Sequence, residues 1–187
     1  MIFFDYNDTK ATQDAAAFLK LNNGKMNYMK LIKLLYLADR EALRQWGRPL
    51  TGDCYFSMKN GPILSNVLNN ISHGKEPKMR SYWHEHISHP SSYNVSLKRD
   101  PGVDELSRRE LDLIASIDKE YKPYDEWQMV DICHKILPEW EDPGRTSIPI
   151  RVEDILRVVH RTEREIAVIE EETTSIQYCD SIFPTSA

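Results

Sequence analysis

The stretch Lys30-Leu-Ile-Lys-Leu-Leu-Tyr-Leu-Ala-Asp-Arg-Glu-Ala-Leu43 decides the fold that we expect for this chain of 187 residues. Its apolar residues recur at the spacing that is typical of an amphipathic helix. The helix should begin after Asn27 and end at Trp46, because Gly47 can terminate it and Pro49 cannot continue it. We therefore predict a long central helix with the rest of the domain packed around it.

The two sides of this helix differ in character when each residue advances by roughly 100°. The apolar stripe consists of Leu31, Leu34, Leu35, Ala38, Ala42 and Trp46. The other side carries three cations that should be solvated, Lys33, Arg40 and Arg44. Tyr36 and Leu37 lie among them. An apolar residue ringed by long cations resembles the centre and rim of a protein interface, and the cations would steer an acidic partner. These five residues are our candidate partner-binding set; the alternative is that the first or last helix packs over Leu37.

Asp39 falls at the edge of the apolar arc, where an unpaired carboxylate would be costly. We expect a structural role for it, with Arg48 as the first candidate partner and the backbone N–H groups of the Gly61 turn as the second; a direct role in binding is the alternative. On a later helix, His134 should be a buried neutral histidine, and Trp140 should pin the loop 139–149 to the body. Together Asp39, Arg48, His134 and Trp140 form our predicted structural polar cluster.

The remaining pattern predicts several shorter elements. Asp8 or Thr9 should cap a first helix that stops at Asn22-Asn23-Gly24, and Pro62 should open a third helix that ends near His73-Gly74. The β-favouring segments Tyr82–Ser88 and Tyr93–Lys98 predict an antiparallel hairpin. Capping boxes predict later helices that begin at Ser107 with Glu110, at Asp125 with Gln128 and at Thr162 with Glu165, and that end near Tyr121, at Leu137 and at Glu172, with a further helix over Val152–Val159.

The expected fold class is thus mainly α, a single compact helical domain with a small antiparallel β-hairpin. We assign residues 1–172 to the domain and 173–187 to a flexible C-terminal tail, because the tail is polar with only isolated apolar residues.

Composition limits the function classes. The chain has 24 Lys and Arg against 29 Asp and Glu, a net charge of −5, so nucleic acid is not the expected partner. The apolar stretches are too short to cross a membrane, and the acidic first residues do not resemble a signal peptide, so we expect a cytoplasmic protein. Three cysteines at long separations predict reduced thiols.

Motifs that carry chemistry are missing from the sequence. It contains no phosphate loop, no dinucleotide fingerprint, no nucleophile elbow and no zinc-protease motif, so we expect no catalytic residue, no cofactor and no metal. Two alternatives remain open at this stage: an enzyme or metal-dependent protein that uses Asp39 and His134, or a metal bound by His84, His86 and His89 beside Glu85.

Several blocks of the sequence resemble one family. They are the stretch from Lys30 quoted above, Trp46-Gly-Arg-Pro-Leu-Thr-Gly-Asp53, Tyr55-Phe-Ser-Met-Lys-Asn-Gly-Pro62, His134 followed by Pro138-Glu139-Trp140, and Val152-Glu-Asp-Ile155. They are similar to the Panacea domain, the SocA-like antitoxin family of bacteria and their phages, over residues 10–172. Cys54 and Asn60 depart from the pattern, which puts the identity of the partner in doubt more than the fold.

The resemblance implies a largely helical antitoxin without enzymatic activity that binds a cognate toxin directly, with a protease as a second partner if the protein also acts as a proteolytic adaptor. A DNA-binding regulator is a third alternative, weakened by the negative charge. If the central helix does not carry the interface, the predicted hairpin of Tyr82–Lys98 is the next candidate surface.

Overall fold

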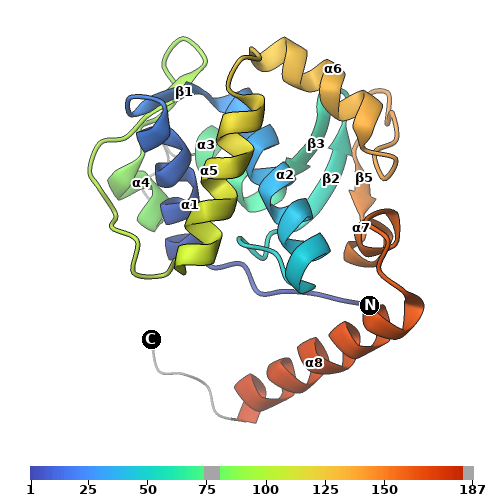
Figure 1. The fold of residues 1–187 in the computed structure, drawn as a ribbon. Coiled ribbons are helices and arrows are strands. Elements are labelled where there is room, and N and C mark those ends of the chain that lie inside the picture. The colour runs from blue at the N-terminus through green and yellow to red at the C-terminus, as the bar shows by residue number, and fades with distance from the viewer. Residues whose placement is uncertain (74–80, 183–187) are drawn as a thin grey trace.

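A computed structural model describes residues 1–73 and 81–182 of the chain and shows a mainly α-helical protein with small antiparallel sheets (Figure 1). The helices of the described part are α1 (Asp8–Leu21), α2 (Tyr28–Trp46), α3 (Ser65–His73), α4 (Tyr82–His86), α5 (Arg108–Tyr121), α6 (Glu126–Ile136), α7 (Val152–Val158) and α8 (Glu163–Ile182). The strands are β1 (Lys25–Asn27), β2 (Tyr55–Met58), β3 (Gly61–Leu64), β4 (Asn94–Ser96) and β5 (Ile148–Ile150).

Helix α2 occupies the centre, as predicted. It packs against α1, α5, α6, α7 and β3, and the run from Leu31 to Asp39 is buried without interruption. An unbroken buried run leaves this part of the helix no solvated side, so the cations expected there cannot all reach water. The predicted ends are confirmed: the Asn27 side chain accepts hydrogen bonds from the backbone N–H groups of Met29 and Lys30, and Gly47 terminates the helix at φ 75°.

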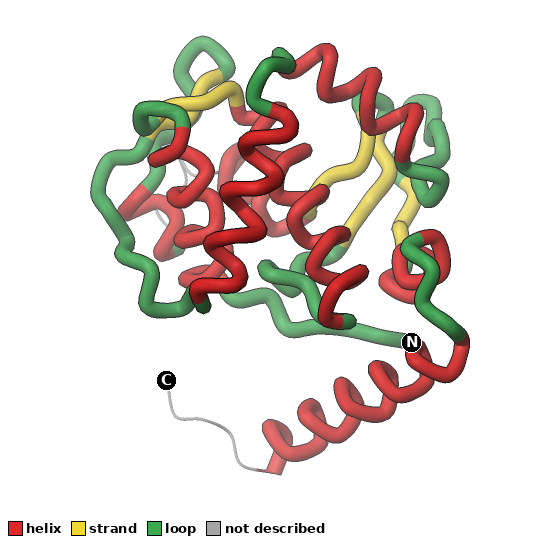
Figure 2. Tube along the Cα trace, viewed as in Figure 1, coloured by secondary structure: helices red, strands yellow, loops and turns green. Residues whose placement is uncertain are grey.

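The strands form two small sheets that Figure 2 shows at the sides of the helical body. One has the order β3-β2-β5, all antiparallel, with Tyr55 opposite both Leu64 and Ile150. The prediction that Pro62 opens the third helix is therefore wrong. Gly61, at φ 92°, turns the chain so that the residues after it pair with β2, and α3 begins only at Ser65.

The second sheet corrects the predicted hairpin. Tyr82–His86 forms helix α4, not a strand, and β4 pairs with β1 along the register Met26 opposite Val95. The two expected arms are joined by one isolated bridge, Ile87 with Leu97, and by backbone hydrogen bonds such as that from the Ser88 N–H to the Ser96 carbonyl, not by a continuous ladder. The helix places Trp83 and His86 in the interior beside α1, and this burial overrides the β propensity of the aromatic residues.

The other helix boundaries follow the capping signals with two exceptions. The capping boxes at Ser107 and Asp125 are present, and α5 and α6 end where predicted. The cap of α1, however, is Asn7, whose side chain accepts from the Lys10 N–H, and neither Asp8 nor Thr9. Helix α8 continues to Ile182 where we expected an end at Glu172, although the side chains from Thr174 to Cys179 are all exposed (Figure 1).

The burial of Leu37 shows whether another helix covers this side of α2. The Leu37 side chain is 5% exposed and lies beside Ile117 and Tyr121 of α5, so another helix does cover it, but α5 does so, neither the first nor the last helix. Leu37→Asp should abolish the cooperative thermal melt, because an unpaired carboxylate in the core costs several kcal/mol. Arg44→Asp, at a position with a 52% exposed side chain on the same helix, is the matched control and should melt almost like the wild type. A folded Leu37→Asp protein would contradict the core assignment.

Candidate functional site

Asp39 is fully buried and holds the chain that follows α2. Its Oδ1 accepts from the backbone N–H groups of Leu50 (2.9 Å) and Thr51 (3.0 Å), and its Oδ2 accepts from the hydroxyls of Thr51 (2.5 Å) and Tyr55 (2.9 Å). We call these four residues the Asp39 cluster. Burial raises the pKa of Asp39 to about 6, and the hydrogen bonds oppose that shift. The structural role predicted for Asp39 therefore has a specific form: the carboxylate binds one turn of backbone and the first strand of the sheet.

The partners of Asp39 differ from those predicted. Arg48 is exposed and does not take part in the hydrogen bonds of Asp39, and the Gly61 turn supplies none of the donors. The backbone immediately after Pro49 reaches the carboxylate first, so a cation is unnecessary. The cluster extends through Thr51, whose Oγ1 accepts from the Asp53 N–H, to Asp53, whose carboxylate accepts from the backbone of Asn66 and Val67 at the start of α3.

A second polar group lies between α2 and the chain after α6. The Glu139 side chain is completely buried, and its Oε1 accepts from the Tyr36 hydroxyl (3.1 Å) and from Arg40 Nε (2.7 Å). We call Glu139, Tyr36, Arg40, Lys33, Cys133, His134 and Trp140 the Glu139 cluster. Sequence reasoning missed Glu139, since a charged residue in a loop with prolines gave no periodic signal of burial.

Lys33, which we predicted to be solvated, is buried in the structure. It is 1% exposed, and its ammonium donates to the Pro62 carbonyl at 2.6 Å. Burial lowers the pKa of Lys33 to about 8 and raises the pKa of the nearby Cys133 thiol to about 11. The Gly61 backbone approaches so closely that a Cβ there would lie 3.2 Å from Lys33 Cε and Nζ. Lys33 thus fixes the β2–β3 turn from inside the protein.

His134 and Trp140 are in contact, but the structure does not join them with Asp39 and Arg48 in the single polar cluster that we predicted. The rings of His134 and Trp140 stack with centroids 3.9 Å apart at 15°, and Trp140 Nε1 donates to the Met58 carbonyl at 3.0 Å. Burial lowers the pKa of His134 below its usual value, which favours the neutral ring that we expected, although the residue is half-buried and not fully enclosed. Trp140 pins its loop to the β2–β3 turn.

The two clusters touch through a pair of tyrosines. The rings of Tyr36 and Tyr55 meet edge to face with centroids 5.5 Å apart, and each hydroxyl donates to the carboxylate of its own cluster. Desolvation raises the pKa of both phenols well above the usual value, and the Cys133 thiol stays protonated at neutral pH. These hydroxyl and thiol groups are therefore not activated as nucleophiles. The two hydroxyls bind the buried carboxylates, and the thiol is packed in the core.

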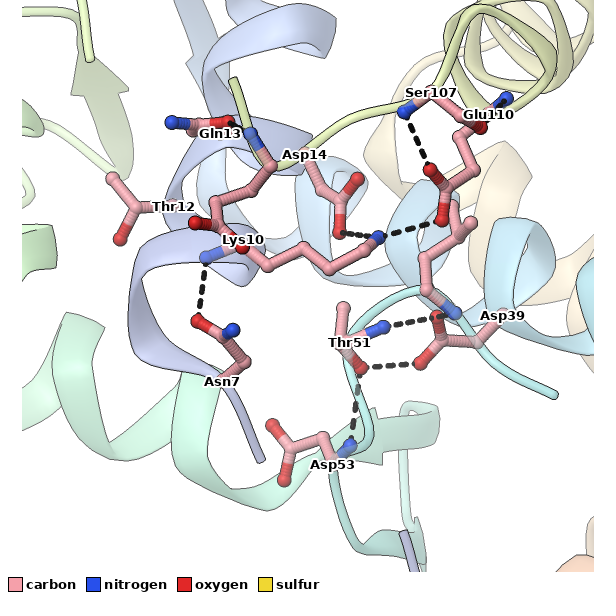
Figure 3. Close-up of polar contacts among 12 residues, drawn as sticks. Asn7, Lys10, Thr12, Gln13, Asp14, Asp39, Thr51, Asp53, Ser107 and Glu110 are labelled. Atoms are coloured by element: carbon pink, nitrogen blue, oxygen red, sulfur yellow. Dashed lines mark hydrogen bonds and ion pairs between the residues drawn. The ribbon is translucent and has the colours of Figure 1, made fainter. Parts of the chain in front are cut away.

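A buried carboxylate on α1 was not among the predicted site residues. Asp14 is fully buried, its Oδ2 lies 3.7 Å from Lys10 Nζ, and the same ammonium lies 2.9 Å from Glu110 (Figure 3). Burial above all raises the pKa of Asp14 to about 8. The negative charge of Asp39 also raises the pKa of Asp14. The helical spacing from Ala11 and to Phe18 was the sequence signal that could have indicated its burial.

The five candidate partner-binding residues are not a free cationic surface. Lys33, Tyr36 and Leu37 lie below the surface, whereas the side chains of Arg40 and Arg44 are 20% and 52% exposed. Both arginines are paired within the chain, Arg40 with Glu139 and Arg44 with Glu41. Their charges are thus largely compensated, and the reason for expecting an acidic partner at this helix no longer holds.

The hairpin histidines are used internally. His84 Nε2 lies 2.8 Å from the Asn70 carbonyl oxygen, and His86 Nδ1 lies 2.9 Å from that of Tyr82. Within residues 1–73 and 81–182, no group of three His, Cys, Asp or Glu side chains is arranged to hold a metal ion. In the same part of the chain, no helix combines the length and the apolar character needed to cross a membrane.

Comparison with protein families identifies a match over the centre of the chain. Residues 31–141, more than half of the chain, match the family described as antitoxin SocA-like, Panacea domain. No curated protein and no solved structure matches the chain. The matched segment begins in α2 and ends directly after Trp140, so it contains the whole of the Asp39 cluster and of the Glu139 cluster.

Asp39→Ala should lower the free energy of unfolding by about 2–4 kcal/mol, because it leaves four buried donors without their acceptor. Denaturant titration measures the loss. Asp112→Ala, at an exposed position of α5, is the matched control and should change stability by less than about 0.5 kcal/mol. Equal stability of the two variants would show that the Asp39 cluster does not hold the fold.

Asp14 should make stability depend on pH. Its pKa is raised from 3.8 to about 8, so the folded protein holds this proton more tightly than the unfolded chain does, and stability falls as the pH rises between those values. Asp14→Asn removes this contribution. Its free energy of unfolding, relative to that of the wild type, should therefore rise by about 1 kcal/mol per pH unit between pH 5 and 7. Parallel curves for the two proteins would refute the raised pKa.

Proposed function

The chain belongs to the SocA-like Panacea antitoxin family, and from that premise we propose that it neutralises a co-encoded toxin by binding it directly. The observation that carries the proposal is the extent of the match, which spans the central helix, the β2–β3 turn and the loop at Trp140. The protein and its toxin would then share one compartment, the cytoplasm, since neutralisation requires contact before the toxin reaches its target.

The chemistry of the two clusters supports binding and not catalysis. The buried hydroxyl and thiol groups have pKa values raised by desolvation, and the carboxylates of Asp39 and Glu139 accept hydrogen bonds from groups that fix the backbone. An enzyme needs a nucleophile or base that reaches a substrate from a cleft. The buried hydroxyl groups and carboxylates of the two clusters already hold turns of the chain through hydrogen bonds. This arrangement is typical of a rigid protein that presents a surface to another protein.

Two modes of neutralisation satisfy the proposal. The antitoxin can block the toxin within a stable complex, or it can deliver the toxin to a protease as an adaptor. Blocking leaves the toxin at its normal level in the cell, whereas delivery shortens its half-life. Immunoblots of the toxin after protein synthesis is stopped, with and without this protein, separate the two modes.

Expression of the neighbouring open reading frame alone should arrest growth, and co-expression of this protein should restore it. In the blocking mode the two proteins should co-purify as a stable complex. In the delivery mode they should co-purify when the protease is absent. The destabilised Leu37→Asp variant is the control and should fail to rescue. A neighbouring product that is harmless alone, or toxic and neither bound nor neutralised, would contradict the antitoxin role.

A further inference from the structure

A groove of about 480 Å³ lies beside the start of α2. Four separate parts of the chain form it: the start of α2 with Tyr28, the β2–β3 turn with Asn60, the loop before β4 with Tyr93, and the first turn of α6 with Glu126 and Trp127. We call it the Trp127 groove. Neither the Asp39 cluster nor the Glu139 cluster lines it.

The aromatic side chains of this groove are unusually exposed. Trp127 is 60% exposed and Tyr93 is 71% exposed, and the Tyr93 ring lies 6.3 Å from that of Tyr28. Helix α6 uses its other side, with Met129 and Cys133, to pack into the core, so core packing does not explain Trp127. Exposed tryptophan and tyrosine around one depression are typical of the residues that dominate binding energy in protein interfaces.

The backbone at Tyr93 gives a second, independent indication. Ser92 and Tyr93 have φ values of 49° and 62°, in the left-handed region that residues other than glycine rarely adopt. The Tyr93 carbonyl accepts the hydrogen bond from the Tyr28 N–H at 2.9 Å, which ties this turn to the start of α2. The turn at Ser92 and Tyr93 is therefore strained although the exposed Tyr93 side chain contributes little to the core. Strained backbone of this kind is common at binding sites.

The charge of the groove indicates the chemistry of its occupant. Glu126 is the one charged residue among those that line it, and within the described part of the chain its carboxylate has no ion-pair partner. The ammonium of Lys30, the cation that interacts electrostatically with it, donates instead to the carbonyls of Lys122 and Tyr124. Aromatic faces beside a free carboxylate favour a guanidinium, which stacks on rings and pairs with carboxylates through two N–H groups.

We propose that the Trp127 groove binds an arginine side chain of the toxin, stacked on the aromatic rings and paired with Glu126. The assignment of the partner rests on the proposed function. The net charge of −5 acts in the same direction, since it attracts a basic partner segment over a distance.

The test measures the dissociation constant of the purified complex with the neighbouring gene product for Trp127→Ala, Tyr93→Ala and Glu126→Gln. Each should weaken binding at least about tenfold, as the loss of an interface hot spot does. Tyr178→Ala and Glu171→Gln on α8 are matched controls of similar type and exposure, and should bind like the wild type. All five variants should melt like the wild type because the substituted residues lie outside the core.

The identity of the bound group is tested from the side of the toxin. Replacing each toxin arginine with alanine should reveal one variant whose loss of affinity is not additive with that of Glu126→Gln. Wild-type binding should also weaken with salt more steeply than binding of Glu126→Gln. Full affinity of the three groove variants would overturn the groove while leaving the antitoxin role intact. Full affinity of Glu126→Gln alone would overturn the arginine. A wild-type protein that neither binds nor neutralises would refute the proposed function and, with it, the toxin as occupant of the groove.

Discussion

The burial of α2 along the whole run from Leu31 to Asp39 is the constraint on which the rest of the structure depends. A helix enclosed in this way must satisfy its polar side chains inside the protein, because water cannot reach them. Asp39 meets this requirement with four donors from the chain between Leu50 and Tyr55. These hydrogen bonds attach β2, and with it the three-stranded sheet, to α2.

The same requirement organises the opposite side of the helix. Lys33 binds the Pro62 carbonyl, and Tyr36 and Arg40 bind Glu139, so three polar side chains of α2 fix the β2–β3 turn and the loop after α6. Buried ionic groups of this kind are poor evidence for stability, since well-packed apolar residues could replace them. Their effect here is positional, because each one specifies where a particular loop must lie.

These positions have a consequence for binding. The start of α2, the β2–β3 turn, the loop before β4 and the first turn of α6 meet at the Trp127 groove, and the buried Lys33 holds the β2–β3 turn from inside the protein. A surface that is rigid before the partner arrives loses less conformational entropy on binding than a flexible one. If the Trp127 groove binds the partner as proposed, the buried polar residues of the central helix contribute through the surface that they support, without touching the partner.

The sequence by itself determined the local elements. The caps at Asn27, Ser107 and Asp125 and the stop at Gly47 predicted the ends of α2, α5 and α6, because capping depends on hydrogen bonds between residues a few positions apart. The blocks from Lys30 to Trp140 were sufficient to indicate the family. Periodicity also marked Asp39 as a carboxylate in an apolar arc.

Only the tertiary structure decided what surrounds each element. The helical projection assumed one buried side, and it therefore assigned Lys33, Tyr36 and Leu37 to a surface that α5, α6 and β3 cover. It could not identify the partners of Asp39 or find Glu139, because those contacts join residues far apart in the chain. For the same reason the sequence did not predict that Tyr82–His86 forms a helix against α1, and it did not reveal the Trp127 groove, which four distant segments form together. Local hydrogen bonding can be predicted from neighbouring residues, whereas burial depends on every element that packs against a helix.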